Sequence, residues 1–437
     1  MNPLAQALNQ QIQSANPHVL DMLSDFGKEF YFPKGILSQS AEAKAKAKRY
    51  NATIGTASED GVAMNLPSVM GAIPGITPDE ALLYAPPAGL PDLRAAWQAK
   101  NLVDNPGLAG VPMSQPVVTN GLTHGLGLVA DLFVNPGDTV LLPDKQWDNY
   151  PLIFGLRREA VLRDFPFFAG EGFNQDGFAG ELAKLAAEGK KKVVVLLNFP
   201  NNPTGYTPTE AEGEAIAASL LNAAEGGMNV VVLIDDAYFG LFYGAAPMRQ
   251  SLFAKLAGKH PRLLAIKADA ATKEVFVWGL RIGFLTYSVG GAAADSPLYQ
   301  ALVSKTMGCI RSLISNCSSL SQTVVLRALR NPAFRAEHDA KVAVMEERAA
   351  EVKRVLADAA FAEAWDAYPF NSGYFMCLRL KKIGAEALRL HALDRYGIGT
   401  IALGETDLRI AFSCLEVGQI EDLFRTLHQA WQDLAGA

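Results

Sequence analysis

The sequence has few of the residues that build disulfide frameworks and metal sites. Its 437 residues include 4 cysteines and 6 histidines. No two cysteines have the C-x-x-C spacing, and no two histidines lie one helical turn apart. A disulfide scaffold and a zinc site both need more such residues at closer spacing. We therefore expect free, buried cysteines and no metal site.

An excess of positive charge and long apolar runs are also missing. The 39 lysines and arginines are outnumbered by 45 aspartates and glutamates, which gives a net charge of -6 and no basic surface for nucleic acid. The apolar runs at 193–197 and 230–234 are far shorter than the roughly 20 residues of a membrane helix. The N-terminus has neither the basic flank nor the apolar core of a signal peptide. We expect a cytoplasmic protein with neither nucleic-acid nor membrane partners.

What the sequence does contain is a series of short, continuous apolar runs. They begin near residues 139, 191, 228, 262 and 281, and residues 180–189 and 209–225 between them have the apolar spacing of helices. Continuous rather than alternating runs are typical of strands that helices cover on both faces. The pattern predicts an α/β fold with a mostly parallel sheet sandwiched by helices.

The C-terminal third has a different character. A long helical segment from 336 is followed by short strand-like pieces near 375 and 407. Residues 1–65 have few strand signals and are too few to form a core of their own, so we expect them to pack on the C-terminal part. These features predict a large domain over residues 66–330 and a smaller α+β domain formed by residues 1–65 and 331–437.

Polar residues gather where the apolar runs end. Asn202 lies in a rigid N-N-P-T-G turn after one run, Asp235 and Tyr238 follow the next, and Lys273 and Arg281 follow the third. Ligands of open α/β sheets bind at the carboxyl ends of the strands. We therefore expect these side chains to share one pocket.

The chemistry of this set fits pyridoxal phosphate. Lys273 suits an imine to an aldehyde, Asp235 suits a protonated ring nitrogen, and Tyr238 with Asn202 suits a phenolate oxygen. The helix that opens at Gly121, Leu122 and Thr123 offers free backbone amides to a phosphate, and Arg281 adds a bidentate cation.

The ordered motifs Y-x4-G, G-x-T, N-N-P-T-G, D-x-A-Y, T-K and R-x-G-F resemble the fold-type I, class I/II aminotransferases of the aspartate aminotransferase superfamily. The resemblance covers nearly the whole chain and keeps the eight-residue spacing from Lys273 to Arg281. It implies catalytic roles for Lys273, Asp235 and Tyr238 and a shared active site in a homodimer. It also implies that the cofactor contacts Tyr84 of a neighbouring subunit, Gly121, Leu122, Thr123, Trp147, Asn202, Asp235, Tyr238, Thr272, Lys273 and Arg281.

The same resemblance implies three substrate contacts. Arg409 corresponds to the arginine that binds the substrate α-carboxylate, a role that suits its planar fork, and Gly55 to a backbone group over the substrate. Arg311 either binds a side-chain carboxylate in the partner's site or, at the start of a helix, forms a structural ion pair.

Two positions depart from the family pattern. Ala270 stands where the family often has a phosphate-binding serine, so Thr272, or Asp269 with a water, would have to compensate. Tyr150 stands where aspartate aminotransferases carry a histidine near the ring-nitrogen network. We expect both the phosphate contacts and that network to differ here.

A competing motif is the G-x-G-x-x-A from Gly125 to Ala130, which is typical of dinucleotide-binding folds after a strand. Nicotinamide binding leaves Lys273 and Asp235 unexplained, and we expect both glycines to lie inside a helix.

The resemblance implies transamination through a Schiff base of pyridoxal phosphate on Lys273, with glutamate and 2-oxoglutarate as one substrate pair. A lyase that eliminates a β- or γ-substituent is the alternative on the same fold. A cofactor-sensing regulator is disfavoured, because Tyr84 already belongs to the enzyme part and leaves no space for a DNA-binding domain before it.

Overall fold

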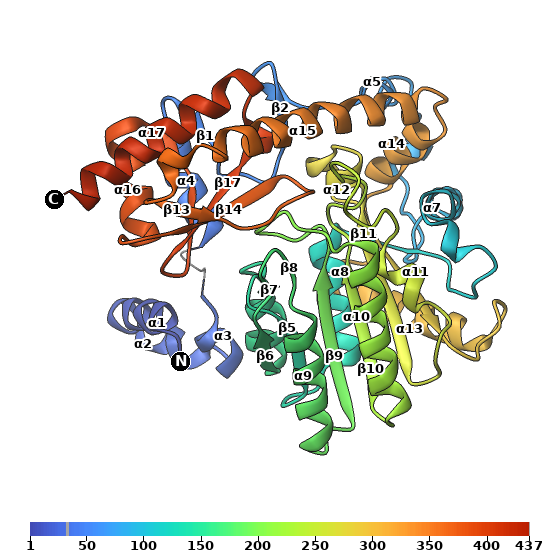
Figure 1. Ribbon diagram of the computed structural model, residues 1–437. Helices are drawn as coiled ribbons and strands as arrows, with labels where there is room; N and C mark the ends of the chain where they lie inside the picture. The colour runs from blue at the N-terminus through green and yellow to red at the C-terminus, as the bar shows by residue number, and fades with distance from the viewer. Residues whose placement is uncertain (32–34, 437) are drawn as a thin grey trace.

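The structure is a computed structural model and describes residues 1–31 and 35–436. A large unit around a seven-stranded sheet lies beside a smaller unit with a four-stranded sheet (Figure 1). Within the two described ranges, no helix combines the length and the apolar character that crossing a bilayer requires.

The seven-stranded sheet has the strand order β4-β12-β11-β10-β9-β5-β6. Its neighbouring strands run parallel except at β12, which is antiparallel to both β11 and β4. The predicted α/β fold with a mostly parallel sheet is confirmed. The strands are β4 (Val117–Thr119), β5 (Thr139–Pro143), β6 (Val161–Phe165), β9 (Lys192–Asn198), β10 (Asn229–Asp235), β11 (Leu263–Ala270) and β12 (Gly283–Val289).

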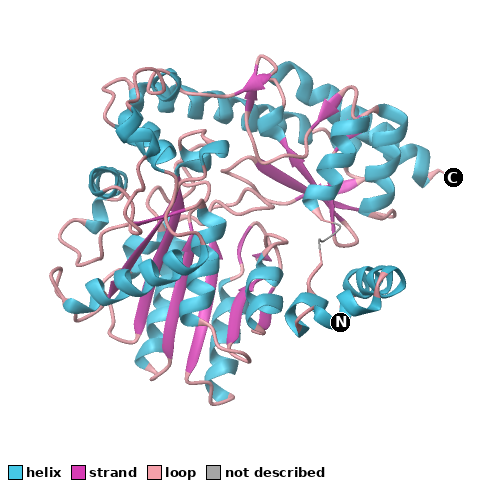
Figure 2. Cartoon of the chain, turned by 180° about the vertical axis from the view of Figure 1, so that it is seen from behind, coloured by secondary structure: helices cyan, strands magenta, loops and turns pink. Residues whose placement is uncertain are grey.

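The apolar runs are continuous because both faces of this sheet are buried. Along β9, Val193 and Val195 belong to the core on one side, whereas Val194 belongs to the core on the other. Helices lie on both sides of the sheet in Figure 2. The helices of the large unit are α7 (Pro91–Asp104), α8 (Leu122–Phe133), α9 (Gln175–Ala187), α10 (Glu210–Glu225), α11 (Leu252–Leu256), α12 (Ala271–Glu274), α13 (Pro297–Leu313) and α14 (Ser319–Leu329).

The G-x-G-x-x-A motif from Gly125 to Ala130, which resembles a dinucleotide-binding motif, lies inside α8. Gly125 packs so closely on β12 that an added Cβ would lie 3.3 Å from Leu285 Cδ2, whereas Gly127 faces open space. Neither glycine forms the strand-to-helix turn that holds a pyrophosphate. The prediction that both fall within a helix is correct.

The smaller unit is built on the strand order β13-β14-β17-β16. Residues near the N-terminus join it, because β1 (Tyr50–Asn51) pairs in parallel with β15 (Ile398–Gly399). The domain boundaries at 65 and 330 stay predictions. The other elements are α4 (Ile36–Lys46), α15 (Phe334–Leu356), β13 (Trp365–Ala367), β14 (Phe375–Leu380), α16 (Ala385–Tyr396), β16 (Ile401–Leu403), β17 (Asp407–Ala411) and α17 (Val417–Ala435).

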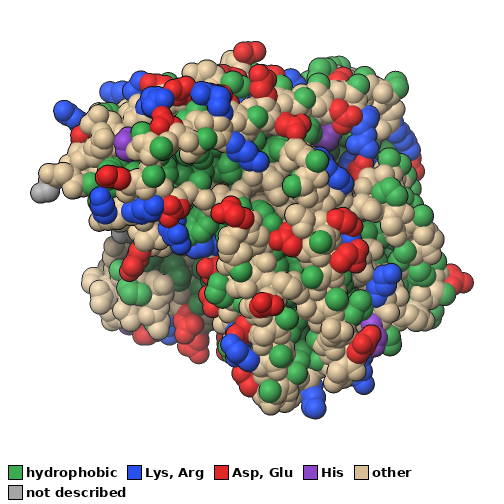
Figure 3. Space-filling view, viewed as in Figure 1, with side chains coloured by type: hydrophobic (Ala, Val, Ile, Leu, Met, Phe, Trp, Pro, Cys, Tyr) green, Lys and Arg blue, Asp and Glu red, His purple; other side chains and the backbone are tan. Residues whose placement is uncertain are grey.

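The first helices, α1 (Pro3–Ala15), α2 (Pro17–Met22) and α3 (Asp25–Glu29), pack on one another. They lie beside both units, and a hollow separates them from the rest of the surface in Figure 3. Short elements complete the chain between the N-terminal region and α7, and between β6 and α9: β2 (Ser58–Glu59), β3 (Val62–Ala63), α5 (Pro67–Met70), α6 (Pro78–Leu82), β7 (Phe168–Ala169) and β8 (Gly172–Phe173).

Candidate active site

A cavity of about 290 Å³ opens at the carboxyl ends of the central parallel strands. Asn198 and Asp235 end β9 and β10 in register, and Lys273 follows β11 within α12. This is the edge at which open α/β sheets bind ligands. The sequence-predicted residues that line the cavity are Gly55, Leu122, Thr123, Trp147, Asn202, Asp235, Tyr238, Thr272, Lys273, Arg281 and Arg409.

Lys273 is poised to lose its proton near neutral pH. Loss of water around the ammonium lowers the pKa of Lys273 to about 8, with Arg281 acting in the same direction and Asp235 opposing both. Its Nζ lies 4.7 Å from the centre of the Tyr238 ring. A lysine in this state supplies a useful fraction of neutral amine, which is the nucleophilic form.

Asp235 is a buried carboxyl held by three donors. Tyr150 donates its hydroxyl to Oδ2 at 2.7 Å, and Oδ1 accepts from the Ala237 amide at 3.0 Å and from Asn198 Nδ2 at 3.3 Å. Burial raises the pKa of Asp235, while the Tyr150 hydroxyl and the charge on Lys273 oppose that rise. Tyr150 is thus a direct partner of Asp235, and the expectation that this network differs from that of aspartate aminotransferases stays a prediction.

The anion-binding end of the cavity is formed by α8 and Arg281. Gly121 caps α8 with a φ of 76°, and a Cβ at this position would lie 2.4 Å from Arg281 Nη2. Thr272 presents a buried hydroxyl without a hydrogen-bond partner among the described residues. A helix N-terminus, a guanidinium and a free hydroxyl that converge on one cavity fit a phosphate group.

The two residues expected to compensate for Ala270 differ in their position relative to the cavity. Ala270 is fully buried at the end of β11 and has no hydroxyl to offer. Asp269 is turned into the core, where Oδ2 accepts from Lys267 Nζ at 2.6 Å and from Trp97 Nε1 at 2.9 Å. Its other oxygen, Oδ1, is buried without a hydrogen-bond partner among the described residues. Thr272 lines the cavity and Asp269 does not, so Thr272 is the better placed of the two to replace a serine hydroxyl.

Arg409 also lines this cavity. It donates from Nη1 to Asn202 Oδ1 at 3.0 Å and from Nη2 to the Thr53 carbonyl at 2.8 Å, while Nε is buried without a partner among the described residues. Its guanidinium lies 4.1 Å from the centre of the Phe375 ring. Burial lowers the pKa of Arg409, although Tyr238 and other groups oppose that effect. A desolvated guanidinium with an unused donor is ready for an anionic ligand.

Gly55 lines the cavity close to Tyr238 and Phe375. A Cβ on Gly55 would lie 3.2 Å from Phe375 Cζ and 3.4 Å from the Tyr238 hydroxyl, so any larger residue would narrow the space between them.

Three predicted residues are not among those that line this cavity: Gly121, which caps α8 beside Arg281, and the exposed Tyr84 and Arg311. Tyr84 is 91% exposed, and Arg311 is exposed in the last turn of α13, where it donates to Ser315 Oγ at 2.5 Å. Arg311 therefore lies in the last turn of a helix and does not begin one, and its side chain bonds to the Ser315 hydroxyl and forms no ion pair with any residue that the structure describes. The expectation of a structural ion pair at a helix start is wrong.

Other lining residues were missed by the sequence analysis. Asn198 could have been found as the first polar residue after an apolar run. Besides donating to Asp235, it accepts a hydrogen bond at Oδ1 from the Asn202 backbone amide at 2.7 Å. Ile36, Ile54, Trp278 and Phe375 also line the cavity but belong to no motif.

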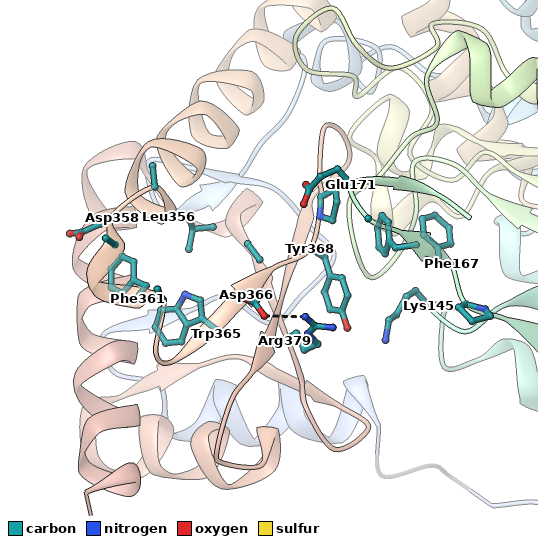
Figure 4. A pocket seen from close by; sticks show the side chains of 18 of the residues that line it. Lys145, Phe167, Glu171, Leu356, Asp358, Phe361, Trp365, Asp366, Tyr368 and Arg379 are labelled. Atoms are coloured by element: carbon teal, nitrogen blue, oxygen red, sulfur yellow. Dashed lines mark hydrogen bonds and ion pairs between the residues drawn. The ribbon is translucent and has the colours of Figure 1, made fainter. Parts of the chain in front are cut away.

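A larger cavity of about 900 Å³ lies between the β7–β8 hairpin and the small sheet. Figure 4 shows Lys145 and Tyr368 at its inner side and the Asp366–Arg379 pair, with a distance of 3.0 Å, on the small sheet. Lys145 also pairs with Asp407 at 2.7 Å, which ties the loop before Trp147 to the strand that carries Arg409. This larger cavity contains none of the predicted site residues, so the smaller one is the candidate active site.

Comparison with known sequences gives one family and a group of named relatives. The family described as "Aminotransferase class I and II" matches residues 54–427. The aspartate aminotransferase of Streptomyces avermitilis is 31% identical over 209 residues, which are 46% of each chain. The LL-diaminopimelate aminotransferase of Desulforudis audaxviator is 30% identical over 217 residues, or 48% of this chain and 50% of that one. The chain thus spans about half the length of the curated relatives it matches.

Solved structures share the fold over almost the full length. An aminotransferase from Anaerococcus prevotii superposes with a TM-score of 0.79 at 21% identity, covering 94% of this chain and 98% of that one. The Pyrococcus horikoshii kynurenine aminotransferase gives a TM-score of 0.78 at 17% identity, covering 96% and 99%. At these identities the likeness establishes the fold alone.

Proposed function

The chain belongs to the class I and II aminotransferases, and from this premise we propose that it transfers an amino group between an L-amino acid and a 2-oxo acid. The observation that carries this proposal is the position of Lys273, whose lowered pKa accompanies a cavity shared with Asp235, Arg281 and Arg409. Aminotransferases of this family depend on pyridoxal phosphate, and the polar groups of this cavity fit that cofactor.

Residues of this chain would hold each part of the cofactor. The N-terminus of α8, Thr272 and Arg281 bind the phosphate, because they supply backbone amides, a free hydroxyl and a guanidinium. Trp147 and Asp235, which line the cavity, would pack on the ring and keep a proton on its nitrogen, and Tyr150 donates to the Asp235 carboxylate. Tyr238 and Asn202 donate to the ring oxygen.

When bound, pyridoxal phosphate supplies an aldehyde carbon that condenses with amines and a ring that accepts an electron pair. Lys273 would hold that carbon and, as a free amine, would move a proton to and from the substrate α-carbon. The pKa of about 8 allows the amine to take up that proton and release it near neutral pH. Asp235 and Arg281 set this balance by opposing charges.

Arg409 would bind the substrate α-carboxylate through its planar fork. We propose glutamate and 2-oxoglutarate as one substrate pair, with Arg311 of a partner subunit binding the side-chain carboxylate. The exposure of Arg311 and Tyr84 outside their own cavity supports a homodimer in which both reach the neighbouring site. Leu82 and Leu83, which are 80% and 61% exposed beside Tyr84, support an interface at this surface.

The test is a half-reaction. The purified protein should absorb visible light as a protonated imine does, and glutamate added without an acceptor should bleach that band and release one 2-oxoglutarate per site. Lys273→Ala should abolish both the band's response and keto-acid release in a folded protein, whereas Lys184→Ala, at an exposed lysine, should leave them unchanged.

Other outcomes separate the alternatives. A coloured protein that releases ammonia and a 2-oxo acid from β-substituted amino acids, and no 2-oxoglutarate from glutamate, would identify an elimination lyase. A protein that takes up no pyridoxal phosphate, or Lys273→Ala protein with full transamination, would overturn the proposal.

A further inference from the structure

A polar stripe on α7 faces the segment that carries Lys273. Its members are Trp97, Lys100, Asn101 and Asp104, and their spacing of three and four residues places them on one side of the helix. Trp97 and Asn101 are buried, and Lys100 and Asp104 keep only 12% and 9% of their side chains exposed. Because a helix normally turns its apolar residues inward, an inward polar stripe needs partners inside the protein.

Two members of the stripe hold the end of β11. Trp97 Nε1 and Asn101 Nδ2 donate to Asp269 Oδ2 at 2.9 and 3.1 Å. The Trp97 ring also stacks on Phe284 of the neighbouring strand β12, with 4.1 Å between the ring centres. The backbone that leads into Lys273 is therefore fixed to α7.

The other two members hold the residue that follows Lys273. Lys100 Nζ pairs with the Glu274 carboxylate and with Asp104 Oδ2, the latter at 2.7 Å. Among the described residues, Lys100 alone donates to Glu274, whose side chain is 2% exposed. Arg335 of α15 binds Asp104 at 2.5 Å and completes a chain of alternating charges. The ion pair at Glu274 is thus shielded from solvent and weakly screened by salt.

The helix α12 needs contacts from outside because it is a single turn. It has four residues, too few to be stable alone, and its cap residue Ala270 forms no side-chain hydrogen bond. Polar side chains hold it at two points: the Tyr374 hydroxyl donates to the Lys273 carbonyl at 3.2 Å, and Lys100 binds Glu274. Consecutive side chains leave a helix about 100° apart, and here Lys273 enters the cavity while Glu274 reaches α7. A shift of Glu274 therefore turns α12 and moves the Lys273 amine.

Resting on the proposed function, we propose that Glu274, held by Lys100, is a positioning residue that keeps the Lys273 amine where transamination requires it. Neither Glu274 nor Lys100 lines the cavity, so neither is placed to touch a substrate there. A misplacement of about 1 Å in an active site costs up to about a hundredfold in rate. Glu274→Leu should therefore lower kcat by roughly tenfold to a hundredfold and leave the KM for glutamate nearly unchanged, because Arg409 keeps its contacts.

The position of Lys273 can be measured without cofactor or substrate. Trace acetylation of the cofactor-free protein at a series of pH values, followed by peptide mass spectrometry, gives the pKa of the Lys273 amine, which burial lowers to about 8. In Glu274→Leu the amine should leave its buried position, so its pKa should rise toward the ordinary value of a lysine. Loss of a negative charge by itself would lower that pKa, so a rise identifies a change of position.

The variant should fold, because Lys100 keeps Asp104 as its partner and no unpaired charge is left in the core. Glu274→Ala removes the same contact without added volume and repeats the test. Glu274→Gln keeps an oxygen that accepts from Lys100, so it should retain the lowered pKa of Lys273 and a kcat close to that of the wild type.

Glu214→Leu is the matched control. It removes a carboxylate of α10 that pairs at 2.7 Å with Lys255, which at 10% exposure is as enclosed as Lys100, and it should change neither the pKa of Lys273 nor kcat. A wild-type pKa and kcat in both Glu274→Leu and Glu274→Ala would overturn the proposal, and so would equal losses in Glu214→Leu. A wild-type protein without any half-reaction would refute the proposed function alone, since acetylation reports the position of Lys273 independently.

Discussion

Replacing Tyr150 by phenylalanine would test the charge state of Asp235. The Tyr150 hydroxyl lies 2.7 Å from Asp235 Oδ2 and is the one donor that the described residues give to that oxygen. A hydrogen bond to a charged group contributes about 1.5–3 kcal/mol, against about 0.5–1.5 kcal/mol for a neutral one. The variant should therefore be less stable by about 1.5–3 kcal/mol at pH 8, where we expect Asp235 to be ionised.

The loss should depend on pH in a defined direction. Burial holds the folded pKa of Asp235 above its ordinary value, and loss of the Tyr150 donor raises it further. A raised carboxyl pKa costs stability at high pH, and that cost disappears as the pH falls through the folded pKa toward about 4. The difference in the free energy of unfolding between wild type and Tyr150→Phe should therefore fall, in acid, to the about 0.5–1.5 kcal/mol expected for a hydrogen bond to an uncharged carboxyl.

Urea unfolding of the cofactor-stripped protein between pH 8 and pH 5 measures this difference. Tyr287→Phe is the matched control, because Tyr287 is equally buried and its hydroxyl lies 2.7 Å from the neutral Thr306 Oγ1. Its destabilisation should not vary over the same pH range. If both variants behave alike at every pH, Tyr150 is not the donor to an ionised Asp235 and the reasoning fails.

Three further changes test other parts of the site. Arg311→Leu should raise the KM for glutamate by roughly tenfold while that for leucine stays within about threefold, since only the side-chain carboxylate loses a cation; equal changes would contradict the assignment. Lys100→Met removes the cation paired with the buried Glu274, and burial raises the pKa of Glu274 to about 7. Chemical denaturation should therefore show that the free energy of unfolding falls by about 3–5 kcal/mol at pH 8, where Glu274 is mostly ionised, and by less at pH 6. Gly121→Ala should weaken pyridoxal phosphate binding in a fluorescence titration, because its Cβ displaces Arg281, whereas Gly127→Ala in the same helix should not.

Much of the fold could be predicted because short sequence patterns indicate where its strands and helices lie. Strands buried on both faces need apolar residues at every position, so β9 and β10 appear as unbroken runs, and the polar residues at their ends mark the binding edge. The spacing of the motifs also predicted that Lys273, Arg281, Asp235 and Tyr238 would lie together, and all four line one cavity. Strand direction was less visible, because an antiparallel strand buried on both faces, such as β12, has the same composition as a parallel one.

Side-chain direction and distant partners were decided by the tertiary structure. The sequence could not show that Asp269 Oδ2 pairs with Lys267 and Trp97 in the core, because those partners are set by side-chain direction. Tyr150 is 85 positions from Asp235 and yet donates to it directly.

The sequence by itself determined the layers, the binding edge and the chemistry of the central residues, because apolar periodicity and short motifs act over a few positions. The tertiary structure alone decided which apolar residues line the cavity. Ile36, Trp278 and Phe375 come from an N-terminal helix, a turn after α12 and a strand of the smaller unit. Nothing local marks them, since an apolar residue that faces a cavity and one that fills a core have the same composition until the chain has folded.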